Sequence, residues 1–291
     1  MTLVNSSMDI TKPRDSATVI LVRQSEKTGW EVLLARRHQR QSFMAGAYVF
    51  PGGQVDEADG DFLDCIRMPD PFNPAALLRN SALTREQAVR LFVCAFRETF
   101  EETGILLAVT ADGRYPENSR IGFCREEIRN GVSTFHDMVR RERFFLPFDR
   151  LLPYAYWITP EIVPKRFSTW FFLASLPEGQ SVSTDAVEMT DYMWITPREA
   201  LRRNTGKEIQ LMPPTLKTLE ELSAYATLDA LWNATRKKVI YPVLPQPEGN
   251  MLKLPHDPEY SLEKYKQPPR PGEPSRIILT DGIWHTSFYP G

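Results

Sequence analysis

The stretch Arg97-Glu98-Thr99-Phe100-Glu101-Glu102-Thr103-Gly104-Ile105 closes a predicted helix that begins near Thr84. Thr84 and Gln87 have the spacing of a capping box at the helix start, and Gly104 fits a cap at its end. At about 100° per residue, the apolar side chains of this segment fall within one arc. They are Val89, Phe92, Val93, Phe96 and Phe100. This arc predicts the face that packs on the core.

Three carboxylates occupy the opposite face of the same helix. Glu98, Glu101 and Glu102 stand at i, i+3 and i+4, so they share one side. Carboxylates this close repel one another unless they are solvated or a cation lies among them. A solvated acidic stripe is the alternative, but the helix dipole disfavours acids near a C-terminus. Hard cations such as Mg²⁺ prefer these oxygens, and Arg97 could orient one of the glutamates.

Together with an upstream Pro51-Gly52-Gly53, this segment resembles the signature of the Nudix hydrolases. That signature has Gly, five residues, Glu, seven residues, then Arg-Glu-apolar-any-Glu-Glu-any-Gly-apolar. Thr99 replaces the apolar position, and Asp59 stands where Glu is expected, with Glu57 as an alternative. From Asp59 to Arg97 is 38 positions where the uninterrupted signature has eight, so 30 extra residues interrupt it. We expect an insertion at about 60–83, because a long loop costs little entropy when its ends already lie close.

An interruption at this place is similar to one in the coenzyme A diphosphatase branch. The resemblance covers about residues 16–230. Segments similar to that branch are Phe43–Gly53, Trp157–Pro160, Pro164–Phe167 and Leu211–Thr215. Leu33, Leu34 and Arg37 fit the first part of the coenzyme A signature. The middle arginine of that signature is absent, since Ser42 stands four residues before Gly46.

The resemblance implies the α/β class: a Nudix-type α/β/α sandwich around a mixed sheet. The alternation of apolar strands and amphipathic helices agrees with this class. We expect a tail over 1–15, the Nudix domain over 16–240 and a proline-rich arm over 241–291. Asp281-Gly282 predicts that the arm ends in a hairpin. The arm could dock on its own domain or on a partner subunit, which would give a homodimer.

The resemblance also implies the chemistry. Mg²⁺ or Mn²⁺ would be held by Glu98, Glu101 and Glu102, with Asp59 as a further ligand, so that Arg97 and the three glutamates form the catalytic group. Gly52 and Gly53 would let the backbone turn tightly beside the phosphates. Water would then attack one phosphorus and displace the other phosphate. The general base is either one of these glutamates or an acid in a later loop. The later candidates are Glu161, Asp185, Glu188 and Asp191.

Basic and aromatic side chains are candidates for substrate binding. Arg36, Arg37, Lys165 and Arg166 suit extra phosphates, although the same residues could serve only solubility. Trp157, Phe167 and Trp170 could stack on an adenine or pack in the core.

The predicted activity is metal-dependent hydrolysis of a diphosphate that links a nucleoside to another moiety. Coenzyme A or an acyl derivative is the first expectation. ADP-ribose, nucleotide sugars and dinucleotides are the alternative substrates. The rival of another class is a non-catalytic nucleotide-binding module on the same fold.

Charge and composition argue against nucleic acid and membranes as partners, and the resemblance implies a small-molecule, nucleotide-type substrate. With 35 Lys and Arg against 37 Asp and Glu, the net charge of −2 gives no sign of nucleic-acid binding. No apolar run is long enough to span a membrane. The three cysteines show no metal-binding or disulfide spacing, which predicts reduced, buried thiols in a cytoplasmic protein.

Overall fold

The computed structural model describes residues 12–38, 46–67, 73–78, 83–182 and 189–291. Its strands are β1 (Arg14–Ser25), β2 (Gly29–Arg37), β3 (Tyr48–Val49), β4 (Gly52–Gln54), β5 (Ile66–Arg67), β6 (Leu146–Pro147), β7 (Leu152–Ile158), β8 (Phe167–Ser175), β9 (Met189–Ile195), β10 (Pro242–Val243), β11 (Gln246–Glu248), β12 (Met251–Lys253), β13 (Arg276–Thr280) and β14 (Ile283–Ser287). Its α-helices are α1 (Pro74–Leu77), α2 (Arg85–Thr103), α3 (Asn118–Arg129), α4 (Phe135–Arg141), α5 (Pro197–Thr205), α6 (Pro213–Ser223) and α7 (Leu228–Lys237).

A mixed sheet runs through the molecule in the order β10-β7-β8-β1-β2-β3, with β4 paired to β1 and β9 to β2. Strand β1 is its centre: it pairs in parallel with β8 along one edge and antiparallel with β2 and β4 along the other. Strand β10 adds to β7 in parallel. Because β4 pairs with Ser16–Thr18 on β1, the glycine pair Gly52-Gly53 is fixed against the middle of the sheet.

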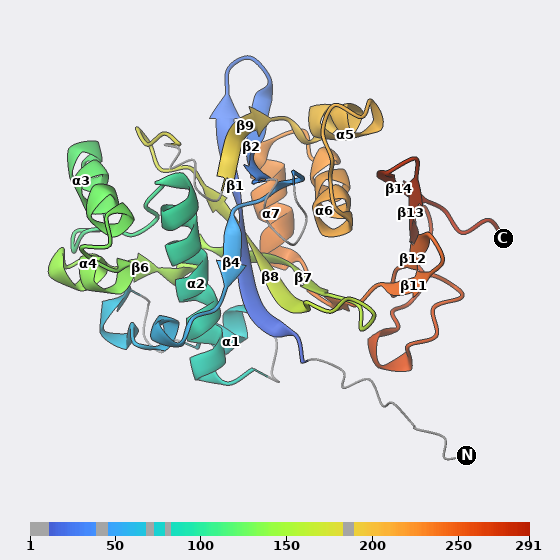
Figure 1. The fold of residues 1–291 in the computed structure, drawn as a ribbon, viewed down its shortest axis with the longest axis horizontal. Coiled ribbons are helices and arrows are strands. Elements are labelled where there is room, and N and C mark those ends of the chain that lie inside the picture. Colours follow the sequence, from blue (N-terminus) through green and yellow to red (C-terminus); the bar gives the residue numbers. More distant parts are fainter. Residues whose placement is uncertain (1–11, 39–45, 68–72, 79–82, 183–188) are drawn as a thin grey trace, which may run out of the picture.

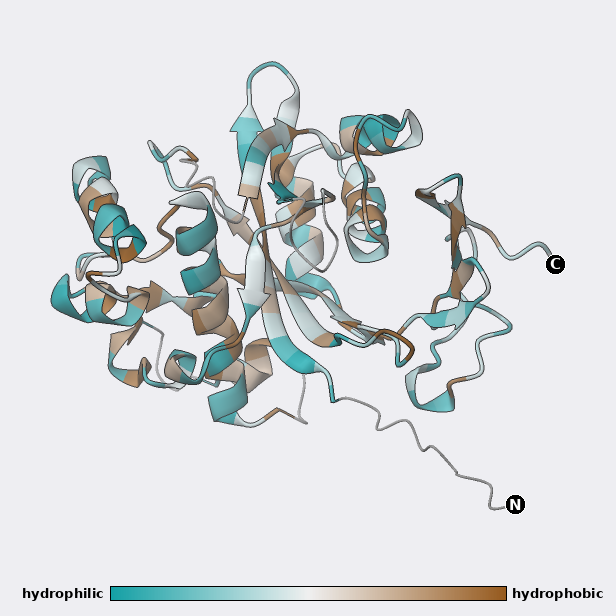
Figure 2. Ribbon diagram, viewed as in Figure 1, coloured by the Kyte–Doolittle hydropathy of each residue, from teal (hydrophilic) through white to brown (hydrophobic). Residues whose placement is uncertain are grey.

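Helices cover both faces of this sheet, as Figure 1 shows. One core lies under α2, α3 and α4, and it contains the predicted apolar arc of α2. The other lies under α5, α6 and α7. Successive residues of β8 alternate between them: Phe172 belongs to the first core and Leu173 to the second. Figure 2 shows hydrophobic residues on α2, on α6 and along the sheet between them. The predicted α/β/α sandwich is confirmed.

Helix α2 has the ends that its sequence predicts. The Thr84 hydroxyl accepts from the Gln87 N–H at 3.1 Å, and the Gln87 side chain accepts from the Thr84 N–H at 2.9 Å. Gly104 ends the helix in the left-handed region, at φ +73°. Thr99, at the apolar position of the signature, is fully buried and donates its hydroxyl to the Ala95 carbonyl at 2.7 Å. The hydroxyl therefore has its hydrogen-bond partner within the helix, so Thr99 can be buried in the core.

The residues inserted before α2 pack on the helix in the part that the structure describes. Phe62, Cys65 and Leu78 are buried in the first core. A short helical turn over Glu57–Gly60 precedes them and places Asp59 beside α2. The insertion thus adds to the core instead of only projecting from the surface.

The chain after α7 forms strands where the sequence predicts an extended arm. Strands β11–β14 make a separate antiparallel sheet. Pro242 and Pro247 lie in β10 and β11, which are the edge strands of the two sheets, where a missing N–H costs least. The β13–β14 hairpin turns at Asp281 and Gly282, both with positive φ, as predicted.

This small sheet docks on its own chain, the first of the two arrangements expected. The Asn204 amide donates to the Trp284 carbonyl at 3.0 Å, and the Thr286 hydroxyl donates to Glu220. Ile277 is fully buried in the second core. A homodimer through the arm stays a prediction.

Some local features differ from the expectations. The charged segment 126–143 is expected to be helical with a break at Gly131, and it forms two helices that are separated there, where Gly131 has φ +68°; however, the first of them, α3, begins at Asn118, earlier than expected. Helix α7 was not predicted. Strand β1 begins at Arg14, before the expected domain start at 16.

The predicted state of the cysteines holds. Cys65, Cys94 and Cys124 are all buried and free. Among the described residues, we find no helix with the length and apolar character needed to cross a membrane.

Candidate active site

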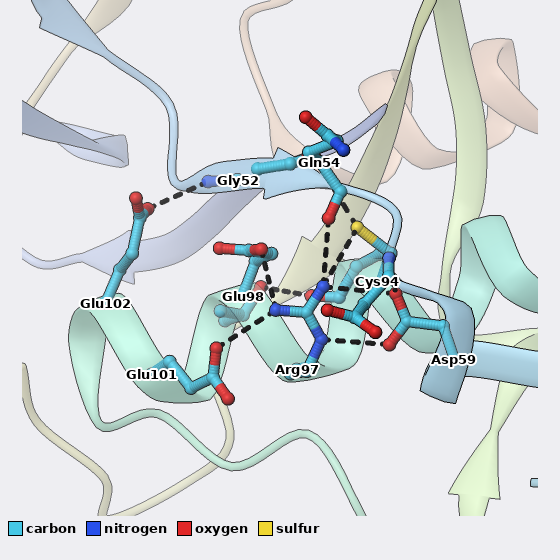
Figure 3. Close-up of polar contacts among 12 residues, drawn as sticks. Gly52, Gln54, Asp59, Cys94, Arg97, Glu98, Glu101 and Glu102 are labelled. Atoms are coloured by element: carbon cyan, nitrogen blue, oxygen red, sulfur yellow. Dashed lines mark hydrogen bonds and ion pairs between the residues drawn. The ribbon is translucent and has the colours of Figure 1, made fainter. Parts of the chain in front are cut away.

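Arg97 is the centre of the polar contacts on α2 (Figure 3). Its Nε and Nη2 donate to the two carboxylate oxygens of Asp59 at 2.9 and 3.1 Å. Its Nη1 donates to Glu98 at 2.7 Å and to Glu101 at 3.0 Å, and Nη2 also donates to the Gln54 carbonyl at 3.0 Å. One guanidinium therefore holds two of the three glutamates and joins α2 to the turn before the insertion.

The third glutamate is held by the glycine pair. Gly52 donates its N–H to Glu102 at 2.9 Å. A Cβ on Gly53 would lie 2.4 Å from the carboxyl carbon of Glu98, and a Cβ on Gly52 would lie 2.3 Å from the Ala17 carbonyl. The backbone of β1 therefore excludes a side chain at Gly52, whereas a side chain at Gly53 would displace the Glu98 carboxylate. This close approach brings the backbone of β4 against the acidic face of α2.

Burial and ion pairing determine the charge states of Arg97 and Cys94. Burial alone would lower the pKa of Arg97, but its bonds to Asp59 and the charge of Glu98 raise that pKa above its ordinary value. Burial, together with Glu98, raises the pKa of the Cys94 thiol well above its usual range. Arg97 is therefore a permanent cation, and Cys94 stays neutral, donating to the Gly53 carbonyl at 3.5 Å.

A divalent metal is compatible with this donor set. Glu98 and Glu101 point to the same guanidinium nitrogen, and Glu102 follows on the same helix face. Gly53 leaves the space that the Glu98 carboxylate occupies. Carboxylate oxygens are the ligands that Mg²⁺ and Mn²⁺ prefer. In the arrangement that the structure has, however, no three His, Cys, Asp or Glu side chains among the described residues are grouped so that they could hold a metal ion.

The glutamates open into a cavity of about 1120 Å³. The structure brings eight of the predicted site residues together around it. They are Gly52, Gly53, Arg97, Glu98, Glu101, Glu102, Arg37 and Lys165. Asp59, Arg36 and Arg166 are not among the described lining residues.

The side chains outside the lining have other contacts. Asp59 is fully buried, and besides Arg97 it accepts from the Asp56 N–H at 2.8 Å. Arg166 is buried and donates to the Thr159 carbonyl at 3.0 Å. Arg36 lies on β2 opposite Tyr48 and Asp191.

Some of the candidate bases and candidate aromatic residues lie at the cavity and others lie elsewhere. Glu161 is exposed and lies outside the lining, and Asp191 accepts from the Tyr48 hydroxyl at 2.9 Å. Asp185, Glu188 and Ser42 lie outside the described residues. Trp157 and Phe167 line the cavity. Trp170 is buried in the first core and stacks on Tyr156, with 4.6 Å between the two ring centroids.

Sequence reasoning missed one side of the cavity. Part of the lining comes from β11, β12, β14 and the turns beside them. The start of α6, from Met212 to Thr215, also contributes, and this segment had been singled out only by its resemblance to the coenzyme A branch.

The comparisons with known proteins agree with this geometry. A family model described as the NUDT19 Nudix domain matches residues 13–222, more than half of the chain. The chain belongs to the Nudix hydrolases. This Nudix hydrolase has helix α2 and the glycine pair Gly52-Gly53 inside the matched region, whereas β11–β14 lie beyond it.

Curated relatives of this Nudix hydrolase carry names that describe an activity. The acyl-coenzyme A diphosphatase NUDT19 of Xenopus laevis is 29% identical, over 83% of this chain and 76% of its own. The Homo sapiens protein of the same name is 31% identical over 70% of this chain, and the match spans 63% of that protein. Among solved structures, a Nudix hydrolase from Alicyclobacillus acidocaldarius superposes with a TM-score of 0.63 at 23% identity, covering 78% of this chain and 96% of its own. That likeness supports the fold.

Proposed function

We propose that the protein is a metal-dependent diphosphatase that hydrolyses coenzyme A or acyl-coenzyme A. The observation that carries the proposal is the acidic face of α2, where Glu98, Glu101 and Glu102 open into one cavity together with Arg37 and Lys165. The names of the relatives give the substrate class.

Each residue of the site has a part in the proposed reaction. Glu98, Glu101 and Glu102 would hold the Mg²⁺ or Mn²⁺. A bound metal of this kind neutralises the diphosphate and lowers the pKa of a water molecule. Arg97 orients Glu98 and Glu101, and the Gly52 N–H orients Glu102. Arg37 and Lys165 would contact the phosphates.

The reaction itself is a hydrolysis. Water attacks one phosphorus of the diphosphate, the bridging P–O bond breaks, and the other phosphate leaves with that oxygen. With coenzyme A, the products are 3′,5′-ADP and the phosphorylated pantetheine arm. The proton of the water passes to a carboxylate, and the glutamates of α2 are favoured over Glu161 because they line the cavity.

We propose that Asp59 acts on Arg97 and is not a metal ligand. Both of its oxygens already accept hydrogen bonds from Arg97, and one also accepts from Asp56. Its side chain is 1% exposed, so metal binding there would require these bonds to be exchanged. The cytoplasmic location and the choice between Mg²⁺ and Mn²⁺ stay predictions.

Hydrolysis of a diphosphate panel tests the proposal. The panel contains coenzyme A, acetyl-coenzyme A, ADP-ribose, NADH and a dinucleotide polyphosphate, each with Mg²⁺ or Mn²⁺. We expect metal-dependent release of 3′,5′-ADP from coenzyme A, reduced at least about 100-fold in Glu101→Gln. Glu86→Gln is the matched control, because Glu86 lies on the same helix and is 69% exposed; it should keep full activity.

Three other outcomes would correct the proposal. Turnover of ADP-ribose alone would change the substrate and keep the enzyme. No turnover of any compound, with no metal binding by calorimetry, would indicate a nucleotide-binding module. A loss of metal affinity in Asp59→Asn at unchanged folding stability would make Asp59 a ligand.

A further inference from the structure

The cavity beside the glutamates extends well beyond the room that a diphosphate needs. Its volume of about 1120 Å³ exceeds the range of roughly 300–1,000 Å³ in which drug-sized ligands bind. The far part of its lining comes from the C-terminal sheet, outside the residues matched as a Nudix domain. We name this lining the C-terminal wall. It consists of Pro245, Pro247, Gly249, Met251, Leu252 and Trp284.

The C-terminal wall is suited to an apolar ligand. None of its six residues carries a charge, and two of them are prolines, which have no N–H to donate. Lys253, next to Leu252, forms ion pairs with Glu248 of β11 and, at 3.1 Å, with Glu259 in the connection between β12 and β13. The start of α6 continues the apolar lining with Met212, Pro213 and Pro214.

The basic side chains of the lining do not belong to the C-terminal wall. Arg37 ends β2, Arg97 lies on α2 and Arg129 ends α3, whereas Lys165 lies in the connection between β7 and β8. Figure 1 shows β11–β14 beside α6 and the ends of β7 and β8, away from α2. The cavity is therefore charged at α2, where phosphates fit, and the wall itself is uncharged, with Lys165 on the connection beside it.

The C-terminal wall is also held firmly. Trp284 accepts from Asn204 through its carbonyl, and the next residues of β14 reach α6 through the Thr286–Glu220 bond. Leu252 and Trp284 pack against the second core, whose member Ile277 is fully buried between their strands. A wall that is held in one position can discriminate between ligand chains of different length that lie against it.

We propose that the C-terminal wall binds the acyl–pantetheine arm of the substrate and selects for the acyl chain. This inference rests on the proposed function, because it assumes that the diphosphate lies at the glutamates. The nucleotide half of coenzyme A carries a further phosphate and needs cations, which the wall lacks. The acyl arm is the half that an uncharged wall can accept, and each methylene buried there favours binding.

Two substrates measured on one pair of variants test this inference. The quantity is the ratio of kcat/KM for octanoyl-coenzyme A to that for coenzyme A. We expect Trp284→Ala to lower this ratio about tenfold or more, because octanoyl-coenzyme A loses the contacts of its acyl chain in addition to those of the arm that it shares with coenzyme A. His285→Ala is the matched control, since His285 is the next residue, is exposed and lies outside the lining; it should leave the ratio unchanged. Trp284→Phe should restore most of the preference.

Binding without turnover separates this inference from the proposed function. Calorimetry in EDTA compares the affinities of octanoyl-coenzyme A and coenzyme A in the wild type and in Trp284→Ala. If the wild type hydrolyses neither compound but prefers the octanoyl ester through Trp284, the proposed function fails and the C-terminal wall stands. An equal loss for both ligands, or an unchanged ratio in Trp284→Ala, would overturn the role of the wall.

Discussion

Gly53 lies where the backbone of β4 passes against the carboxylate of Glu98. We expect Gly53→Ala to displace that carboxylate, because the added Cβ would come within 2.4 Å of it. The fold should persist, since the clash falls on the end of a flexible side chain. Hydrolytic activity should fall at least about tenfold, with an unchanged thermal midpoint. Activity assays and thermal unfolding of the same preparation measure both effects.

Gly122→Ala provides the comparison. A Cβ at Gly122 meets nothing within 4 Å, and the residue lies inside α3. Activity should be unchanged and stability should rise by about 0.5–1 kcal/mol. Full activity in Gly53→Ala would show that Glu98 need not occupy its present position.

The spacing of the three glutamates predicted that they share one face of α2, because helical periodicity determines that face. The resemblance of the segment and its upstream glycines to the Nudix signature was needed to predict that this face belongs to the site. The partner of Asp59 was not predictable in the same way, because Arg97 lies 38 residues away and the contact depends on the fold of the insertion. Trp284 lines the cavity because the C-terminal sheet docks beside it, and no local sequence pattern predicts that docking.

At the scale of elements, the ends of α2 and the turn between β13 and β14 followed from capping and turn residues. Helix α7 was missed, although Thr227 caps its start and Leu228, Leu231 and Trp232 form an apolar face that packs on the second core. Strands β11 and β12 of the C-terminal sheet were missed because the many prolines of this segment argue against strands. A proline is tolerated in an edge strand, but the sequence alone does not show which strand will lie at the edge of the assembled sheet.

The C-terminal sheet is held by a buried ion pair whose strength depends on pH. Asp257 is fully buried and accepts from Arg276 at 2.9 Å and from Ser275 at 2.7 Å. Burial alone would raise the pKa of Asp257, but these bonds outweigh it and lower the pKa below its ordinary value. The stabilisation is therefore complete above the unfolded pKa of about 4 and is lost as the pH falls through the lower folded value.

Asp257→Asn tests this dependence. We expect a loss of about 2 kcal/mol in the free energy of unfolding at pH 7, because Arg276 loses its buried ion-pair partner and keeps the more exposed pair with Glu259. The difference from wild type should shrink below pH 4. Urea unfolding at both pH values measures it, and a difference that stays constant with pH would contradict the assignment.

At the scale of the whole molecule, the C-terminal sheet should unfold together with the Nudix fold. Ile277 on β13 is fully buried in the second core, and β10 extends the central sheet. We expect Ile277→Ala to lower the free energy of unfolding by about 2–5 kcal/mol within a single transition. Urea unfolding followed by circular dichroism and by tryptophan fluorescence should give coincident curves.

Ile278→Ala, at the neighbouring half-buried position, is the control and should cost less. A separate early transition that alone responds to Ile277→Ala would show that the predicted boundary at 240 divides two independently stable units.

The burial of all three cysteines makes the chain a convenient host for chemical labels. Cys94 and Cys124 are fully buried and Cys65 nearly so, which shields the natural thiols from maleimide and similar reagents. A cysteine placed at an exposed position, as in His285→Cys, would then be the preferred attachment point. A dye coupled there, one residue from Trp284, would report ligand arrival at the C-terminal wall by its emission.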